Sequence, residues 1–157
     1  MLDLILALDA STTAVGWCVG WTDGRYDSSG VYLPPGKEWH ERVSNISGWL
    51  WERIEWEDVE YIAFEVATGN RGNMATHRKL GAVEYVIQQA CSTFDMSCLR
   101  VTASQVKAIG CSKDALAVAE SIVGGTLDAK HAGDQADAVG VWLAAVKLLR
   151  EKEWESL

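Results

Sequence analysis

Near its N-terminus the chain reads Leu4-Ile5-Leu6-Ala7-Leu8-Asp9-Ala10-Ser11-Thr12-Thr13-Ala14-Val15-Gly16-Trp17. Residues 3–9 form an apolar run that ends at a carboxylate, which predicts a largely buried strand. The hydroxyl-bearing residues 11–13 supply turn chemistry, and residues 15–21 predict a second strand. An Asp-Gly pair within residues 22–25 favours a tight hairpin turn into a third strand at about residues 25–33. The chain therefore begins with three predicted antiparallel strands.

Beyond residue 36 the hydrophobic period changes. Apolar residues at positions 39, 43, 46, 50 and 54 predict an amphipathic helix. Short β-branched and aromatic runs at 59–66 and 96–101 predict two more strands, and further helices are expected at 75–90, 103–109, 112–123 and from about 134 to 150. This order, β-β-β-α-β-α-β-α, predicts an α/β fold in which a mixed sheet of five strands carries helices on both faces.

The size and composition favour one cytoplasmic domain. A chain of 157 residues, 48% of them hydrophobic, suits a single domain over residues 1–157. No apolar run approaches the ~18 residues of a membrane span, and the N-terminus has no basic leader, so we expect neither a membrane protein nor a secreted one. The four cysteines, Cys18, Cys91, Cys98 and Cys111, form no C-x-x-C pair and are expected to be reduced thiols.

Charge is distributed unevenly along the chain. The net charge of −8 argues against a nucleic-acid partner at face value, because phosphate binding depends on Lys and Arg. Residues 37–60, however, carry seven acids and three bases, whereas residues 69–113 carry six bases and two acids. The second segment therefore offers a basic region that could meet phosphates, while the first is adequately explained as a solvated helix face.

Four carboxylates occupy positions that a purely structural role explains poorly. Asp9 and Glu65 each lie near the end of an apolar predicted strand, where a buried and uncompensated carboxylate is destabilising. Asp134 and Asp137 are three residues apart and share one face of the last predicted helix. Asp134 could instead complement the first helical turn, and Asp9 and Glu65 could be exposed acids of edge strands.

A more specific interpretation is that these four acids hold a shared cation. If the first and fourth strands are neighbours, Asp9 and Glu65 converge, and the last helix can bring Asp134 and Asp137 alongside. Clustered carboxylates raise one another's pKa unless a cation lies between them. Oxygen ligands without His or Cys suit Mg²⁺ or Mn²⁺ rather than zinc, and two such ions about 3.5–4 Å apart would promote phosphodiester hydrolysis.

Four segments together resemble the RuvC family of Holliday-junction resolvases, which have a ribonuclease-H-like fold. They are residues 6–17 quoted above, Ile62-Ala63-Phe64-Glu65, Ser104-Gln105-Val106-Lys107 and Asp134-Gln135-Ala136-Asp137-Ala138-Val139. The resemblance covers nearly the whole chain in the family's order, and its most specific parts are the D-x-x-D-A block and the Asp before Ser-Thr-Thr. The Ser-Thr-Thr turn looks more like viral or phage relatives, for which the host cytoplasm would be the location.

The resemblance implies a Mg²⁺-dependent endodeoxyribonuclease of the crossover-junction type, acting on branched DNA in recombination and repair. Asp9, Glu65, Asp134 and Asp137 would be its catalytic metal ligands, holding two ions in each active site. Lys107 and Lys113 would lie near the scissile phosphate. The helix at 75–90 resembles the family's dimerisation helix, so a homodimer with two symmetric active sites is expected.

One loop departs from the family. Its bacterial members carry an aromatic residue after the catalytic Glu that inserts into the junction, and residues 67–74 contain none. We expect the following polar and basic residues to contact nucleic acid: Asn70, Arg71, Asn73, Arg78, Lys79, Lys107 and Lys113. Two alternative functions stay open, namely a ribonuclease-H-like nuclease acting on RNA or on flaps and forks, and a junction-binding module without catalysis.

Overall fold

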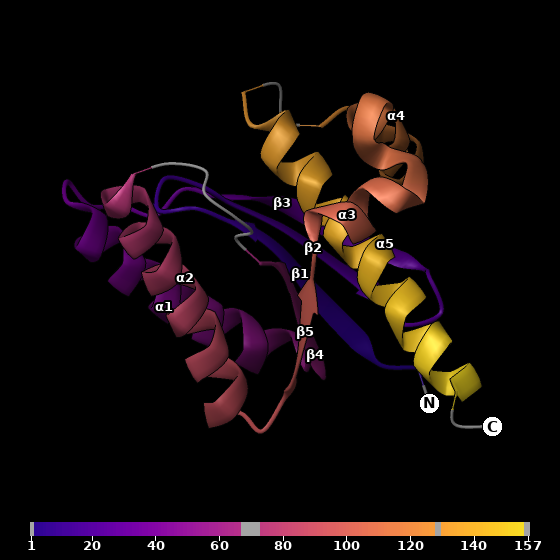
Figure 1. The fold of residues 1–157 in the computed structure, drawn as a ribbon, viewed down its shortest axis with the longest axis horizontal. Helices are drawn as coiled ribbons and strands as arrows, with labels where there is room; N and C mark the ends of the chain where they lie inside the picture. Colours follow the sequence, from indigo (N-terminus) through magenta and orange to yellow (C-terminus); the bar gives the residue numbers. More distant parts are fainter. Residues whose placement is uncertain (1, 67–72, 128–129, 156–157) are drawn as a thin grey trace.

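The computed structural model describes residues 2–66, 73–127 and 130–155, without the side chains of residues 110–115 and 153–155. Three strands are followed by alternating helices and strands (Figure 1). The elements are β1 Leu4–Ala10, β2 Val15–Trp21, β3 Tyr26–Tyr32, α1 Trp39–Glu57, β4 Tyr61–Glu65, α2 Met74–Thr93, β5 Ser97–Val101, α3 Ala103–Val106, a π-helix Lys107–Cys111, α4 Ser112–Val123 and α5 Ala132–Glu155.

The five strands form one mixed sheet in the order β3-β2-β1-β4-β5. The first three pair antiparallel, whereas β4 pairs parallel with both β1 and β5. The hairpin between β2 and β3 turns at Gly24, whose φ of 94° lies in the left-handed region that glycine adopts without strain. The predicted mixed sheet is confirmed, and the order makes β1 and β4 neighbours.

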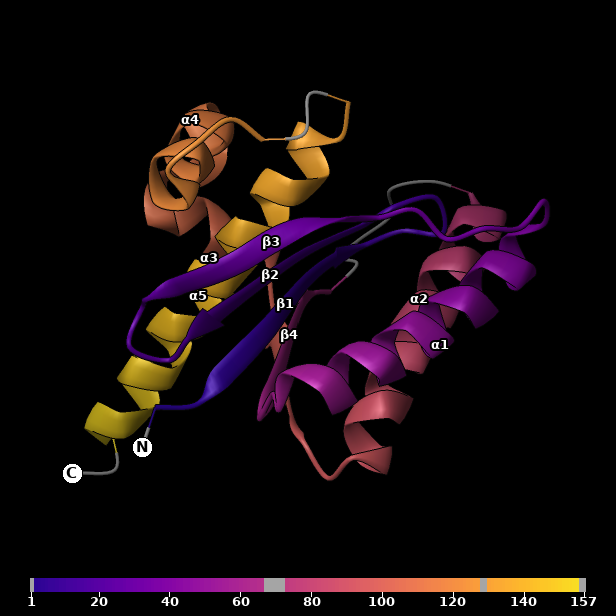
Figure 2. The same cartoon turned by 180° about the vertical axis from the view of Figure 1, so that it is seen from behind.

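Helices cover both faces of the sheet (Figures 1 and 2). Side chains alternate between faces along a strand. Leu6, Leu8, Ile62 and Phe64 therefore pack against α1 and α2, while Ile5, Ala7 and Ala63 pack against α5. In α1 the residues buried on the sheet are Val43, Ile46, Leu50 and Ile54. They are four of the five residues whose spacing predicts this helix.

The segment after β5 differs from its prediction. A single helix is expected at 103–109, but α3 ends at Val106 and a π-helix, Lys107–Cys111, continues the chain. The start of α3 is fixed by a capping box, in which the Thr102 hydroxyl accepts a hydrogen bond from the Gln105 amide at 3.2 Å and the Gln105 side chain accepts one from the Thr102 amide at 2.8 Å. Short π-helical turns often occur at functional sites, and this one begins at Lys107.

No helix within the described ranges is both long and apolar enough to cross a membrane. The helix α5 is the longest element among those described. It lies between the sheet and α4, where Ala119 and Leu127 belong to the same buried cluster as Val139 and Trp142.

Candidate active site

Asp9 and Glu65 are brought to one edge of the sheet by strand register. Leu8 pairs with Phe64 in the parallel ladder between β1 and β4, and the two carboxylates follow these partners by one residue. Side chains alternate along a strand, and the odd-numbered residues of β1 and β4 face α5. Asp9 and Glu65 are odd-numbered, so both side chains lie on the α5 side of the sheet. Each is half-buried.

A glycine in β2 lets the first turn of α5 approach these acids. Gly16 pairs with Asp9 across the antiparallel ladder, and a Cβ at Gly16 would overlap the backbone carbonyl group of Asp134. The missing side chain therefore allows α5 to rest directly on β2 beside Asp9. Four residues further along the same strand face, Gly20 leaves room for the ring of Trp142 in the same way.

A buried glutamine holds the start of α5 against the edge strand. Gln135 is 6% exposed, and its side-chain amide donates a hydrogen bond to the Ser29 hydroxyl of β3 at 2.8 Å. The Ser29 oxygen is also 2.8 Å from the Tyr26 hydroxyl. Because Gln135 lies between Asp134 and Asp137 in the helix, this contact restrains the turn that carries both acids.

The carboxylates perturb one another. Burial raises the pKa of Asp9 from its ordinary 3.8 to about 7, with further increases from the charges of Asp137, Glu65 and Asp134. Burial and then Asp137 raise the pKa of Glu65, and desolvation and then Asp134 raise the pKa of Asp137. Since screened charges interact over about 10 Å or less, the fold brings Glu65, Asp134 and Asp137 into electrostatic range of Asp9.

One of the two predicted lysines lies at this cluster. Lys107, exposed at the start of the π-helix, is close enough to lower the pKa of Glu65 in opposition to its burial. The side chain of Lys113 and residues Asn70 and Arg71 lie outside what the structure describes. Asn73 caps α2, where its side-chain oxygen accepts a hydrogen bond from the Thr76 amide at 3.0 Å.

Carboxylates are the ligands that a hard divalent cation prefers, although these side chains do not converge on one ion position. Three of the four carboxylates have raised pKa values, and a cation bound among them would relieve the repulsion. Among the described residues, no three Asp, Glu, His or Cys side chains are gathered closely enough to hold an ion as they stand. Without a cation between them, like charges repel, and rotation about the side-chain bonds would have to complete the site.

The sequence pattern does not reveal that two residues, Gly16 and Gln135, lie beside the acids. Gly16 is one, because nothing in a strand pattern reveals which helix will cross it. Gln135 is the other, since an amide between two acids looks like an exposed helix residue. His131, which the sequence places three residues before Asp134, lies with its Nδ1 3.5 Å from an Asp134 carboxylate oxygen.

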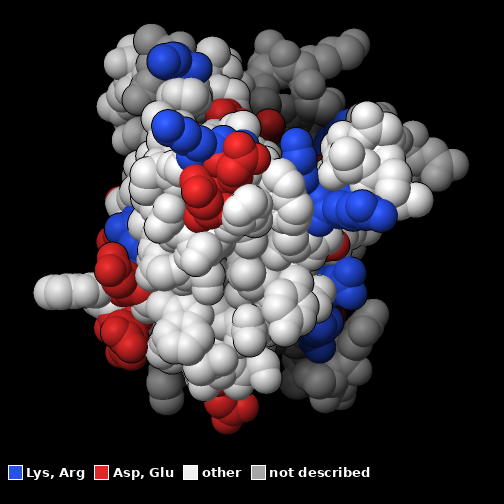
Figure 3. Space-filling model, turned by 90° about the vertical axis from the view of Figure 1, so that its left-hand side faces the viewer, with Lys and Arg blue, Asp and Glu red and all other residues white. Residues whose placement is uncertain are grey.

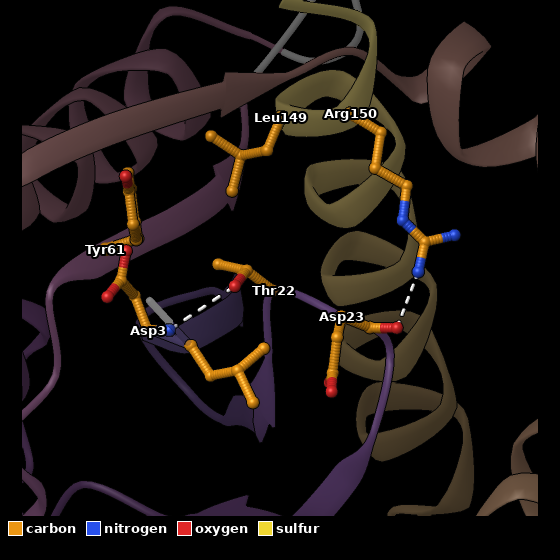
Figure 4. Close-up of a pocket in the computed structure, with 7 residues that line it drawn as sticks. Asp3, Thr22, Asp23, Tyr61, Leu149 and Arg150 are labelled. Atoms are coloured by element: carbon orange, nitrogen blue, oxygen red, sulfur yellow. Dashed lines mark hydrogen bonds between the residues drawn. The ribbon is translucent and has the colours of Figure 1, made fainter. Parts of the chain in front are cut away.

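A pocket lies at the opposite end of the molecule. It has a volume of about 280 Å³ and is lined by residues just before β1, in the β2–β3 turn, at the start of β4 and in α5, among them Asp3, Tyr61 and Arg150 (Figure 4). There the Arg150 guanidinium donates a hydrogen bond to the Asp23 carbonyl at 2.5 Å. Asp3 and Asp9 lie toward opposite ends of β1, so this pocket is separate from the carboxylate cluster.

No family model matches the sequence, and no curated protein matches it either. Solved structures do match the fold. RuvC of Thermus thermophilus, in complex with a Holliday junction substrate, superposes with a TM-score of 0.79 at 19% identity over 95% of this chain and 96% of that chain. The yeast mitochondrial Holliday junction resolvase Ydc2 gives 0.60 at 13% identity, over 98% of this chain and 84% of that one.

The fowlpox virus Holliday junction resolvase gives a TM-score of 0.50 at 9% identity, over 93% of this chain and 99% of that chain. At such identities the likeness establishes the fold. The strand order, the parallel pairing of β1 with β4 and the placement of α5 across β2 are therefore those of a known architecture: along nearly its whole length, the chain has the ribonuclease-H-like fold of RuvC.

Proposed function

We propose that the protein is a metal-dependent endonuclease that resolves four-way DNA junctions by paired nicks. The observation that carries the proposal is the grouping of Asp9, Glu65, Asp134 and Asp137 at one edge of the sheet, where burial and the charges of neighbouring acids raise the pKa values of Asp9, Glu65 and Asp137. The RuvC structure of the same fold is bound to a Holliday junction substrate. A protein that only bound DNA would gain nothing from clustered negative charge beside phosphates.

Asp9, Glu65, Asp134 and Asp137 would hold the metal, with Mg²⁺ or Mn²⁺ as the ion and two ions per site. Bound divalent ions supply Lewis-acid activation of water and neutralise charge on the phosphate. The chain itself supplies the rest. Gly16 and Gln135 fix the turn bearing Asp134 and Asp137, and Lys107 can donate hydrogen bonds to the phosphate and stabilise the charge that develops there.

The direct test is cleavage of a labelled mobile four-way junction with and without divalent metal, alongside Y-shaped and linear DNA and an RNA substrate. Symmetric nicking of the four-way junction that requires metal supports the proposal. Preferential cleavage of RNA, flaps or forks would assign a different substrate to the same site. Tight junction binding with no cleavage in either metal would indicate a binding module instead.

The protein is expected to act as a homodimer through α2. Helix α2 buries Val83, Ile87, Ala90 and Cys91 in the core but leaves Met74 and Tyr85 69% and 63% exposed. The face formed by α1 and α2 has an uncharged area at its lower centre, with acidic groups toward the left edge and basic groups toward the right (Figure 3). A two-fold interface would cover this area and place two active sites in one particle.

Replacing Tyr85 with Lys is expected to convert the dimer to monomer, because a charge would be buried at the interface. Sedimentation analysis should then give a particle of 17.2 kDa instead of twice that mass. The matched control is Leu116→Lys on α4, a residue 44% exposed on the other side of the sheet. A Tyr85→Lys protein that remained dimeric would place the interface elsewhere.

Arg78 and Lys79 are expected to contact phosphates, since they lie in the first turns of α2, which begins shortly after Glu65. Each lost contact should reduce the slope of log K against log salt by about 0.9, so the double alanine variant should lose nearly two units. Lys147→Ala is the control, because Lys147 lies in the far half of α5 beside Glu151. An unchanged slope in the double variant would contradict the assignment.

Stability without metal should fall as pH rises. Because the folded protein raises the Asp9 pKa from 3.8 to about 7, folding favours the protonated acid, and its contribution is complete below pH 3.8 and lost as pH approaches 7. In EDTA, we expect the Tm to drop by a few degrees between pH 5 and pH 8. Both Mg²⁺ and the Asp9→Asn substitution should flatten this dependence, and an equal slope in wild type and variant would contradict it.

A further inference from the structure

Two cysteines lie at the junction between α2 and β5, away from the carboxylate cluster. Cys91 is in the last turns of α2 and is 4% exposed, and Cys98 is the second residue of β5 and is half-buried. Both are free thiols. A short reversal joins the two elements (Figure 1), closed by a hydrogen bond from the Met96 amide to the Cys91 carbonyl at 2.8 Å.

The packing of α2 on β5 places the two cysteines in one hydrophobic cluster. Glu84 and Cys91 are seven residues, or about two helical turns, apart on one side of α2, while Cys98 and Arg100 share one face of β5. Because α2 and β5 run in opposite directions, Glu84 lies opposite Arg100, and Cys91 lies opposite Cys98. In this register the Arg100 guanidinium lies 4.0 Å from a Glu84 carboxylate oxygen. Cys98 packs against the buried cluster that contains Cys91, and the two thiols are close enough to shift one another's pKa values.

We propose that Cys91 and Cys98 are a redox modification site that closes reversibly into an intramolecular disulfide when a peroxide is the oxidant. The Cys98 thiolate attacks one peroxide oxygen and breaks the O–O bond, which yields a sulfenic acid and hydroxide. The Cys91 sulfur then attacks the Cys98 sulfur, and the sulfenic oxygen leaves as water. In sum two thiols and one peroxide give one disulfide and two water molecules, so the sulfurs lose two electrons and the peroxide gains them.

The two thiols differ in the way that this sequence of steps requires. The neighbouring Cys91 thiol lowers the pKa of Cys98, and the nearby positive charge of Arg100 lowers it further against the effect of burial. The interaction with Cys98, together with burial, raises the pKa of Cys91. Cys98 is also the more exposed of the two, so it is the sulfur that a peroxide reaches first.

The experiment treats the folded, full-length protein with hydrogen peroxide, alkylates the remaining thiols under denaturing conditions and analyses the peptides. Trypsin leaves both cysteines in one peptide, residues 80–100, because this segment contains no internal Lys or Arg. We expect this peptide to lose about 2 Da and to escape alkylation. Cleavage before Asp95 should separate the cysteines into two fragments that stay linked until a thiol reductant is added.

Matched variants separate the pair from the other cysteines. Cys18→Ser and Cys111→Ser should still lose two titratable thiols on oxidation, whereas Cys91→Ala and Cys98→Ser should lose none through a disulfide. Thermal unfolding of each variant verifies folding, and Cys98→Ser, at the half-buried position, serves if Cys91→Ala does not fold. A wild-type protein in which the peptide 80–100 remains fully alkylated, or in which Cys98 stops at the sulfenic acid or pairs between chains, would overturn the proposal.

Discussion

Replacing Asp9 with Asn is expected to reduce cleavage of a four-way junction by on the order of a thousandfold, because a lost metal ligand removes several kcal/mol of transition-state stabilisation. Binding of the junction should be unchanged or tighter, since the substitution removes a negative charge beside the phosphates. The charges of the other three acids all raise the pKa of Asp9. Asp9 is therefore the position at which one substitution should do most damage to the proposed site.

The same variant carries its own control for folding. Without metal, the uncharged amide that Asp9→Asn introduces avoids the burial and repulsion that raise the Asp9 pKa, so the variant should be at least as stable as wild type at pH 8. Asp27→Asn is the matched substitution, because Asp27 is an exposed acid on a strand of the same sheet. Undiminished nicking by Asp9→Asn would remove Asp9 from the catalytic site, and equal losses in both variants would point to an indirect effect.

The placement of Asp9 and Glu65 could be predicted from the sequence because it depends on local rules. Each strand is identified by its own apolar run, and two parallel neighbours place their carboxyl ends at one edge of a sheet. The alternation of side chains then sends both acids to one face. The structure makes β1 and β4 parallel neighbours and pairs Leu8 with Phe64, a register that the sequence alone does not give.

The way α5 joins the site could not be predicted in the same manner. The first half of this helix is buried almost all round, because the sheet covers one side and α4 another, so its hydrophobic pattern does not identify the face that meets β2. Residues buried there are Ala136, Ala138, Val139, Val141, Trp142, Ala144 and Ala145. The contact depends on Gly16 and Gln135, whose importance arises only when two distant segments meet.

The fold shows on which elements the acidic and the basic segments of the chain lie. The acidic segment forms most of α1, which packs on the face of the sheet opposite α5. Lys107 instead lies beside Glu65, and Arg78 and Lys79 open α2. A net charge of −8 is therefore compatible with a local basic surface near the proposed site, since the acidic segment forms α1, whereas these three bases lie on other elements.

Adding one methyl group at Gly16 should weaken both the fold and the site. The Cβ of Gly16→Ala would overlap the Asp134 carbonyl, and a backbone group cannot rotate away as a flexible side chain can. We expect the first turn of α5 to be displaced, with a loss of about 3 kcal/mol in the free energy of unfolding. Because Asp134 and Asp137 move with that turn, cleavage measured well below the unfolding transition should fall by tenfold or more.

Two further glycine substitutions make this result interpretable. Gly48→Ala, in α1, has nothing within 4 Å of the added Cβ, so it should stabilise the protein by about 1 kcal/mol through helix propensity. Gly20→Ala overlaps the Trp142 ring instead, and should reduce stability while leaving cleavage closer to wild type, because Trp142 lies more than a turn beyond the acids in α5. Equal stability of Gly16→Ala and wild type would show that α5 does not rest on β2 as described. A loss of cleavage in Gly20→Ala as large as that in Gly16→Ala would mean that overall stability, rather than the position of Asp134, controls the reaction.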